Sequence, residues 1–142
     1  KSVEDLADKI KSLPLDKKQI EMIDPEILYP IKECLGVFGD GLSLEKEKRF
    51  LFKAPYSEFV SSSNVLDEVL VQGVVDLIVT DKNGDKYIVD YKLTYTDDEK
   101  TLKDRYYKQL EIYSKSLLTA TGDVVKGAYL YLIRQGKLVK MF

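Results

Sequence analysis

Two strand-like segments joined by a short turn, between Val71 and Lys92, constrain this chain more than any other feature. The run Val-Gln-Gly-Val-Val-Asp-Leu-Ile-Val-Thr precedes Asp-Lys-Asn-Gly-Asp, and Lys-Tyr-Ile-Val-Asp-Tyr-Lys follows. β-Branched and aromatic residues on both sides of a turn are typical of a β-hairpin. Asp76, Asp90 and Lys92 interrupt the apolar runs, although strands normally exclude aspartate. Because an unpaired buried charge is costly, these three residues indicate a site that binds a divalent cation and polarises an ester.

Two registers of this hairpin are compatible with its turn. A two-residue Asn83-Gly84 turn would place the two acids on opposite faces of the sheet. A three-residue loop that ends at Gly84 with a positive φ places Asp76 opposite Asp90. This second register alone puts the apolar pairs on one face, and period-2 patterning resists a slip of one residue. We therefore predict the three-residue loop, which pairs Val75 with Tyr91, Leu77 with Val89, Val79 with Tyr87 and Asp81 with Asp85.

The pattern alone leaves a structural interpretation open. Asp76 can be a strand-end or bulge aspartate, and Asp90 with Lys92 can be a charge pair of little energetic value. Perturbed charges also occur in purely structural networks. Gly73 likewise fits a position of close backbone packing.

Composition excludes several classes of function. The chain has 142 residues, enough for one domain, and its net charge of −2 comes with both signs interspersed. It therefore lacks the clustered Lys and Arg that sequence-independent DNA binding uses. The single cysteine, Cys34, excludes an internal disulfide and a four-cysteine iron–sulfur or zinc site, and we interpret it as a small buried hydrophobe. Histidine is absent, which removes imidazole catalysis and histidine ligands from these residues.

No segment indicates export or a membrane. These residues contain no signal-peptide pattern and no apolar run long enough to span a bilayer, so we expect a cytoplasmic protein with no membrane partner. The chain begins at Lys1 without methionine and opens with helical sequence. We expect a piece of a longer polypeptide, with a helical lead-in over residues 1–44 and an α/β core over residues 45–142.

The remaining segments predict helices, then strands, then a helix and a strand. Apolar residues at helical spacing run from Val3 to Leu13 and stop near Pro14. The other expected elements are a short helix from Asp16 with a capping box, a helix from Asp24-Pro25 to before Gly36, a loop over 36–43, a strand over 48–59 with an edge or bend at Pro55, a turn over 61–64, a helix over 102–118 that Gly122 follows, and a strand over 127–133 buried on both faces.

The helix over 102–118 carries a second informative pattern. Its apolar stripe consists of Tyr106, Leu110, Tyr113 and Leu117. Arg105 and Gln109 precede Tyr113 at four-residue spacing and form a neighbouring row. Arginine and amide side chains in this position suit contacts with phosphate, base or sugar groups. A helix packed on the sheet with a merely solvated polar row is the simpler interpretation of the pattern alone.

Three motifs, in this order, resemble the RecB-like branch of the PD-(D/E)xK nuclease superfamily. The family pattern is G-x-x-D, D-x-K and Q-x-x-x-Y, and the chain has Gly73-Val74-Val75-Asp76, Asp90-Tyr91-Lys92 and Gln109-Leu110-Glu111-Ile112-Tyr113. The wider wording, such as Leu70-Val71-Gln72-Gly73 and Tyr129-Leu130-Tyr131, is similar to the C-terminal nuclease domain of AddA-type helicase–nucleases. The resemblance is strongest over residues 49–133. Each motif alone is common, whereas the three together are specific.

This resemblance implies a metal-dependent site. Asp76 and Asp90 would ligate Mg²⁺ or Mn²⁺ together with the main-chain carbonyl of Tyr91. Lys92 would orient or activate the attacking water and balance phosphate charge. Hard oxygen ligands favour Mg²⁺, which keeps waters and binds substrate phosphate.

The resemblance also implies DNA contacts and shows two departures. Gln109 and Tyr113 would help position DNA beside the metal, and the row places Arg105 with them. The family usually has an upstream G-T-x-x-H motif whose histidine ligates metal, but this chain has no histidine. The acidic residue of the family's E-x-P-F segment aligns on Lys53.

We therefore expect an α/β, restriction-endonuclease-like domain with a mixed sheet and flanking helices. The implied function is metal-dependent hydrolysis of DNA phosphodiester bonds within a bacterial ATP-dependent helicase/exonuclease of double-strand-break repair and recombination. Its expected partners are DNA and a second, AddB-type subunit. No G-x-x-x-x-G-K-[ST] loop occurs, so motor domains would lie elsewhere in the parent chain. The alternative is a non-catalytic nuclease-like module that binds DNA or holds a partner subunit.

Overall fold

The apolar runs of the sequence form one mixed β-sheet with helices on both faces. The computed structural model describes residues 3–21, 30–58 and 67–142. Its elements, in chain order, are α1 (Val3–Lys11), α2 (Lys17–Glu21), α4 (Pro30–Cys34), the 3₁₀ helix η1 (Leu35–Phe38), β1 (Ser43–Pro55), the 3₁₀ helix η2 (Tyr56–Glu58), β2 (Glu68–Thr80), β3 (Lys86–Lys92), α5 (Glu99–Thr121), β4 (Val125–Leu132) and β5 (Lys137–Lys140).

The strands lie side by side in the order β1-β2-β3-β4-β5. β1, β2 and β3 form an antiparallel meander, α5 then crosses to β4, and β4 is parallel to β3. This arrangement confirms the predicted mixed sheet and its crossing helix. β5, which pairs antiparallel with β4, was not predicted.

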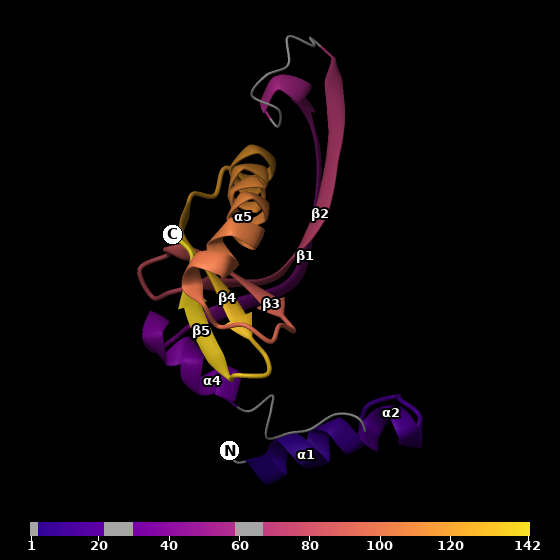
Figure 1. Cartoon of the computed structure of the whole chain (residues 1–142). Coiled ribbons are helices and arrows are strands. Elements are labelled where there is room, and N and C mark those ends of the chain that lie inside the picture. The colour runs from indigo at the N-terminus through magenta and orange to yellow at the C-terminus, as the bar shows by residue number, and fades with distance from the viewer. Residues whose placement is uncertain (1–2, 22–29, 59–66) are drawn as a thin grey trace.

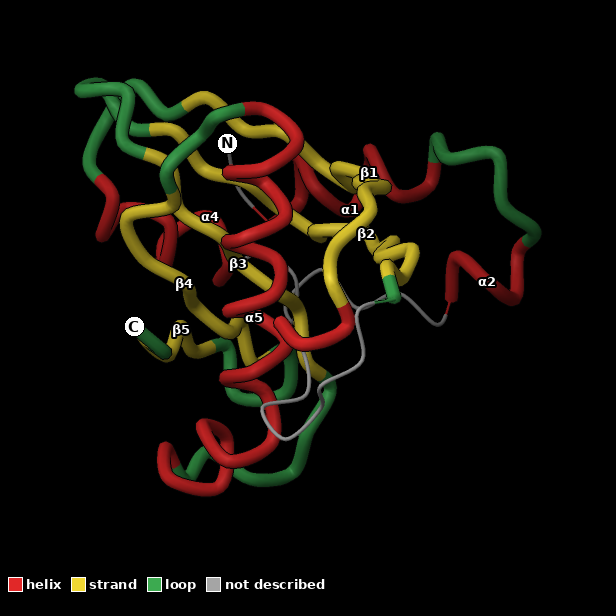
Figure 2. The backbone as a smooth tube through the Cα atoms, turned by 90° about the horizontal axis from the view of Figure 1, so that it is seen from above, coloured by secondary structure: helices red, strands yellow, loops and turns green. Residues whose placement is uncertain are grey.

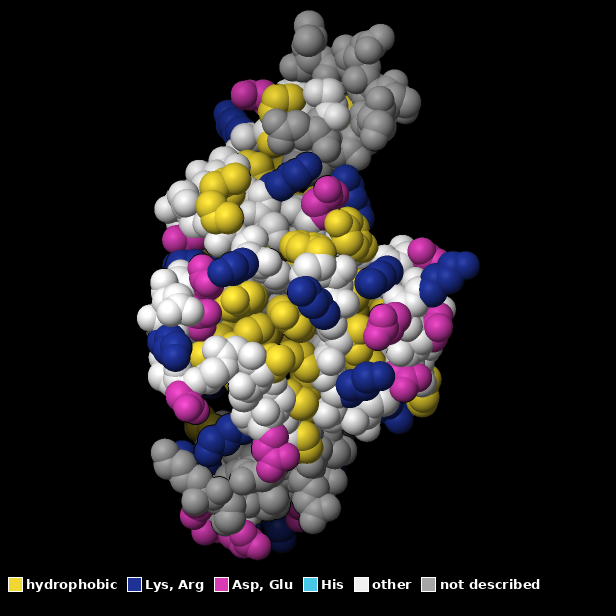
Figure 3. Space-filling model, turned by 90° about the vertical axis from the view of Figure 1, so that its left-hand side faces the viewer, with side chains coloured by type: hydrophobic (Ala, Val, Ile, Leu, Met, Phe, Trp, Pro, Cys, Tyr) yellow, Lys and Arg dark blue, Asp and Glu magenta, His cyan; other side chains and the backbone are white. Residues whose placement is uncertain are grey.

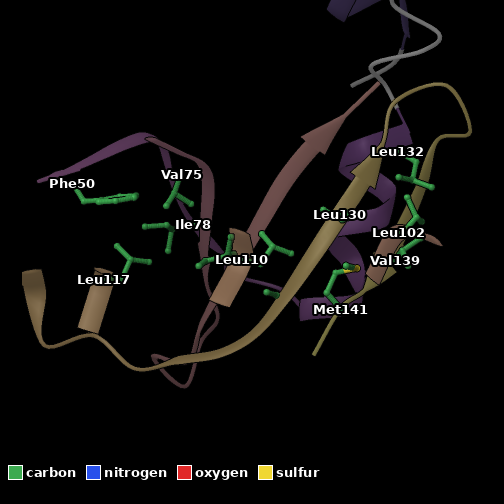
Figure 4. Close-up of a cluster of buried hydrophobic side chains, with 12 residues drawn as sticks. Phe50, Val75, Ile78, Leu102, Leu110, Leu117, Leu130, Leu132, Val139 and Met141 are labelled. Atoms are coloured by element: carbon green, nitrogen blue, oxygen red, sulfur yellow. The ribbon is translucent and has the colours of Figure 1, made fainter. Parts of the chain in front are cut away.

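The core has two layers, one on each face of the sheet. Helix α5 covers one face, whereas α4 and η1 lie on the other (Figures 1 and 2). The cluster under α5 includes Leu102, Leu110 and Leu117 from the helix, with Ile88 and Leu130 from the strands (Figure 4). The cluster on the other face contains Leu35, Leu77, Val79, Val89 and Tyr131. Helices α1 and α2 lie apart from the sheet in Figure 1.

The turn of the β2–β3 hairpin confirms the predicted register. Leu77 pairs with Val89 and Val79 pairs with Tyr87. The Asp81 main-chain N–H donates to the Asp85 carbonyl, and the Gly84 N–H donates to the Asp81 carbonyl, both at 3.0 Å. Gly84 has a φ of 85°, as the three-residue loop requires. The predicted pairing of Val75 with Tyr91 is absent, because the described β2–β3 ladder ends at Leu77.

The β1–β2 hairpin is long and strongly curved (Figure 1). Its ladder is continuous in register except at Glu47, which lies across from Asp76 and has a positive φ of 52°. Val75 packs in the cluster under α5, whereas Leu77 packs on the opposite face. Residues two apart in a regular strand share a face, so the bend changes which side chains face α5. Asp76 lies at this change.

Glycine allows the bent hairpin to approach its own core. A Cβ atom on Gly73 would lie 2.9 Å from Cε1 of Phe50 and closer still to Cζ. Phe50 is buried and its ring lies 5.5 Å, centroid to centroid, from that of Tyr113 on α5. The close packing anticipated for Gly73 is therefore present, and it joins the hairpin to the helix beside the candidate site.

Helix α5 begins and ends with the capping groups that its sequence provides. The Asp98 carboxylate accepts a 2.9 Å hydrogen bond from the Thr101 N–H at the N-terminus. Gly122 adopts the left-handed conformation at the C-terminus, and its N–H donates to the Leu118 carbonyl. Such caps satisfy main-chain groups that a helix end leaves without partners.

Several predicted boundaries were wrong. The segment 36–43 is not entirely a loop, because η1 covers Leu35–Phe38 and β1 begins at Ser43. The strand predicted over 48–59 starts earlier and ends at Pro55, where a 3₁₀ turn follows. Cys34 is only partly buried, and its Sγ donates to the Gly136 carbonyl at 3.4 Å. The predicted start at Asp24-Pro25 and the turn over 61–64 lie outside the described residues.

Candidate active site

Two charged residues of β3 point into the layer beneath α5. Asp90 and Lys92 are two residues apart, so they share a face of the strand, and they lie beside Leu130 and Leu132 of β4. Asp90 is only 3% exposed. Buried carboxylates are rare unless they are paired, so Asp90 is expected to have a charged or polar partner.

Lys92 is the cation next to Asp90. Its Nζ atom forms an ion pair with Oδ2 of Asp90 at 2.7 Å, and this buried oxygen has no other donor among the described residues. Lys92 Nζ also donates to Oε1 of Gln109 at 3.0 Å. The Gln109 amide lies 3.0 Å from Oη of Tyr113, so β3 and α5 are connected by one polar chain.

Asp76 approaches the same place from β2. Its Oδ2 accepts a 2.9 Å hydrogen bond from the main-chain N–H of Tyr91, the residue between Asp90 and Lys92. The Asp76 carboxylate lies close enough to Asp90 for its negative charge to raise the pKa of Asp90. The bend in β2 therefore brings a second carboxylate to the first.

The electrostatics of Asp90 are a balance of opposing effects. Burial raises its pKa, the Lys92 ammonium lowers it, and the nearby Asp76 carboxylate raises it again, with burial the largest effect and the net shift upward. The pKa of Tyr113 is also raised, chiefly by burial, while its hydrogen bond with Gln109 acts in the opposite direction. Perturbed groups of this kind gather at functional sites.

The structure brings most of the predicted site residues together. Asp76, Asp90 and Lys92 meet beneath α5, and Gln109 is hydrogen-bonded to Lys92. Arg105 is exposed, makes no hydrogen bond or ion pair with these described residues, and lines a hollow that adjoins the site through Tyr106. Tyr106 was predicted only as part of the apolar stripe, although Lys92 Nζ lies 4.8 Å from the centroid of its ring. Its position three residues before Gln109 was the available signal, because such residues share a helix face.

One observation indicates that these residues could hold a divalent cation. Oδ2 of Asp90 is a buried carboxylate oxygen with no donor among the described residues besides Lys92, and Asp76 supplies further carboxylate oxygen nearby. Oxygen donors of this kind suit Mg²⁺, which retains several waters and needs few protein ligands. No group of three or more His, Cys, Asp or Glu residues occurs in the part of the chain that the structure describes, so waters, main-chain carbonyls or substrate would complete the shell.

The class of protein follows from this fold and site. A mixed sheet that presents two acids and a lysine beneath a helix carrying Gln and Tyr matches the superfamily that the motifs resemble. Residues 31–141 match the family model described as the PD-(D/E)XK nuclease superfamily. The chain belongs to this superfamily.

Individual relatives extend the similarity to nearly the whole chain. The ATP-dependent helicase/nuclease A-subunit of Clostridium botulinum (strain Langeland / NCTC 10281 / Type F) is 28% identical over 151 residues, which covers 99% of this chain and 12% of that protein. The protein of the same name from Thermoanaerobacter sp. (strain X514) is 30% identical over 154 residues, covering 94% of this chain and 12% of that protein. The chain thus spans about 12% of the length of these relatives.

Proposed function

We propose that this domain hydrolyses phosphodiester bonds of DNA in a divalent-metal-dependent reaction. The observation that supports this most strongly is the buried Asp90 carboxylate, held between the Lys92 ammonium and the Asp76 carboxylate. Two carboxylates beside one ammonium leave a negative charge that a bound cation would balance. The superfamily match and the names of the relatives agree with a nuclease.

Each residue has a distinct role in this proposal. Asp76 and Asp90, with the main-chain carbonyl of Tyr91, would hold Mg²⁺ or Mn²⁺, which when bound polarises the phosphodiester and lowers the pKa of a bound water. Lys92 has three N–H donors, of which one goes to Gln109. A remaining donor can orient the attacking water or stabilise charge on the phosphate.

The residues of α5 position this ammonium and the substrate. Gln109 holds Lys92 through its carbonyl oxygen, and its amide group contacts Tyr113. Fixing a long lysine chain in this way reduces the entropy lost when the reactive geometry forms. Arg105 would contact a phosphate further along the strand.

The wider context is also a proposal. We propose that the domain works within a larger ATP-dependent helicase/exonuclease in the cytoplasm, together with a second AddB-type subunit, in double-strand-break repair and recombination. In such an assembly, motor domains would deliver a DNA strand to the site. No helix in the described part of the chain is long and apolar enough to span a membrane.

Cleavage of labelled linear DNA in Mg²⁺ tests the proposal. Asp90→Asn and Lys92→Met should each reduce the single-turnover rate by about 100-fold or more, while circular dichroism shows the fold unchanged. Asp123→Asn is a matched control, because Asp123 is a surface carboxylate that pairs with Lys86 at 3.7 Å. Equal cleavage by Asp90→Asn and the unsubstituted protein would refute the assignment.

A non-catalytic nuclease-like module is the competing function. It is favoured by the lack of histidine and by the small number of acidic ligands in the described residues. The same experiment separates the two. A module that only binds DNA would show no Mg²⁺-dependent cleavage sensitive to Asp90→Asn, yet would retain affinity for DNA.

A further inference from the structure

A hollow beside Lys92 has features that the proposed cleavage chemistry does not use. The loop after β3 and the first turns of α5 form this hollow, of about 490 Å³, and its lining consists of Leu93, Thr94, Tyr95, Thr96, Thr101, Arg105 and Tyr106. Leu93 directly follows Lys92, and the Tyr106 ring in the wall is the ring that lies 4.8 Å from Lys92 Nζ. The hollow therefore borders the candidate active site.

Large apolar side chains are exposed at this hollow. Tyr95 is 86% exposed and Leu93 is 69% exposed, an arrangement that contributes little to folding because neither side chain leaves water. Tyr95 is nevertheless held in place. The Arg134 guanidinium lies 4.2 Å from the centroid of its ring, and Arg134 Nη2 lies 3.2 Å from Tyr95 Oη. Because the ring is so exposed despite this contact, its opposite face is open to solvent.

Hydrogen bonds from other elements fix the loop that carries Tyr95. Gln135, in the turn between β4 and β5, donates from Nε2 to the Thr94 carbonyl at 3.1 Å. The Thr96 N–H donates to Oγ1 of Thr94 at 3.3 Å, and the Asp98 N–H donates to Oγ1 of Thr96 at 3.2 Å. A fixed aromatic ring loses little conformational entropy when a ligand packs on it.

The charges around the hollow favour an anion. Arg105 has no ion pair or hydrogen bond with any residue that the structure describes, and the same part of the chain offers Arg134 no carboxylate. The two acids of the loop before α5 have other partners. Asp98 caps α5, and Asp97 lies 3.9 Å from Lys137. Two guanidinium groups thus lie beside an open aromatic ring.

We propose that this hollow binds one unpaired nucleotide of the strand adjacent to the cleaved phosphate, with its base on Tyr95 and its phosphate at Arg105. An unpaired nucleotide combines a flat aromatic face with a phosphate, whereas the bases of a duplex already stack on one another. Stacking on an aromatic ring also accommodates any base, because every base has a flat π-face. The identification of this ligand rests on the proposed nuclease function.

Stacking is the more important because the face shown in Figure 3 has no broad basic region among the described residues. On the face shown in Figure 3, Lys and Arg side chains alternate with Asp and Glu around a band of hydrophobic side chains. The net charge of the chain is −2. Long-range attraction of DNA is therefore weak, and contacts near the hollow should contribute a large share of the affinity for a single strand.

Fluorescence anisotropy with a fluorescein-labelled short oligothymidylate tests the stacking contact. EDTA in the buffer prevents cleavage, so the reading is of binding alone. Tyr95→Ala should weaken binding about fivefold or more, whereas Tyr95→Phe, which keeps the ring, should stay within about twofold. Tyr107→Ala is the matched control, because Tyr107 is 42% exposed on α5 but packs against Phe142. Wild-type affinity in Tyr95→Ala would overturn the proposal.

The salt dependence of the same binding tests the phosphate contact. Arg105→Ala should reduce the slope of log affinity against log salt by about 0.7, the value expected for one lost phosphate contact on a single strand. Lys103→Ala is the control for loss of a positive charge, because Lys103 is exposed on α5 outside the hollow. An unchanged slope in Arg105→Ala, or an equal change in Lys103→Ala, would remove Arg105 from the proposal.

Cleavage assays separate this inference from the proposed function. Tyr95→Ala should raise KM about fivefold or more and leave kcat nearly unchanged, because Tyr95 does not touch the reacting atoms. If Asp90→Asn abolishes cleavage but Tyr95→Ala binds normally, the nuclease assignment stands and the nucleotide site fails. If cleavage is independent of Asp90 but binding depends on Tyr95, the nuclease assignment fails and the hollow stands as a nucleic-acid site.

Discussion

The main-chain N–H of Tyr91 donates a 2.9 Å hydrogen bond to the Asp76 carboxylate. This bond joins β3 to β2 directly beyond Leu77, where their described ladder ends and the β1–β2 hairpin bends. The Tyr91 N–H lies beyond the end of the regular ladder. The Asp76 side chain therefore accepts from a main-chain donor that the ladder does not pair. The same bond fixes the orientation of Asp76 toward the segment that carries Asp90 and Lys92.

The neighbours of Asp90 should shift its titration in opposite directions. Lys92→Ala removes a cation that lowers the pKa of Asp90, so the pKa should rise further. Asp76→Asn removes a negative charge that raises it, so the pKa should fall, while the amide oxygen can still accept from the Tyr91 N–H. Carboxyl ¹³C shifts followed against pH would measure both. Shifts of the same sign in the two variants would contradict this arrangement of charges.

The cap of α5 predicts a pH-dependent stability. Hydrogen bonds from Thr101 lower the pKa of Asp98 below its ordinary value of 3.8. A lowered folded-state pKa contributes stability that is fully present above the unfolded value and is lost as pH falls through the folded value. An asparagine at this position would cap without titrating, so the stability advantage of the wild type over Asp98→Asn should shrink as pH falls below 3.8. Urea unfolding of both proteins at several pH values gives the measurement. A difference in unfolding free energy that stays constant with pH would contradict the role of Asp98 as the cap.

Divalent cations should stabilise the folded protein through the acidic pair. Mg²⁺ or Mn²⁺ that binds only the folded state raises the melting temperature with concentration. The effect should vanish in Asp90→Asn and persist in Asp123→Asn, whose substituted carboxylate lies on the surface. We expect weak binding, because two carboxylates and a carbonyl are few ligands, and we expect slow DNA cleavage by these 142 residues alone. Differential scanning fluorimetry with a Mg²⁺ titration gives the measurement.

The contact of Gly73 with Phe50 predicts a destabilising substitution. Gly73→Ala places a methyl group against a buried ring and should cost about 1–3 kcal/mol of unfolding free energy. Gly36→Ala is the control, because a Cβ there meets no atom within 4 Å. In the double variant Gly73→Ala/Phe50→Leu, the two costs should sum to more than the measured loss, since the smaller side chain relieves the clash. Strict additivity in denaturant unfolding would show that the clash is not the cause.

The predictable parts of the fold are those with a clear period or a specific turn. The hairpin register followed from apolar alternation and from Gly84, and α5 followed from its stripe and caps. The bend at Asp76 did not, because residues 74–79 are apolar at nearly every position and alternation cannot reveal a change of face there. β5 was missed because its four residues include two lysines and only two apolar side chains.

The residues of the candidate site were likewise only partly predictable from the sequence. The motifs brought attention to Asp76, Asp90, Lys92 and Gln109, but the contact between Lys92 and the Tyr106 ring needs the crossing of α5 over β3. Tyr95 escaped notice because a lone tyrosine in a polar loop has no pattern. Its proposed role rests on its exposure and on its contact with Arg134, which lies 39 residues away in the sequence.

The bend at Glu47 and Asp76 makes the part of the β1–β2 hairpin farther from β3 an arm that is joined to the sheet at one end. The part of β2 before Asp76 pairs only with β1 in the described ladders. This arm is therefore attached at the bend, and α5 supports one of its faces (Figure 1). A sideways force on the free end of such an arm produces its greatest bending moment at the attached end. Because Asp76 lies at this attached end, we expect a force on the arm to act most strongly on the residue that also contacts the Tyr91 N–H.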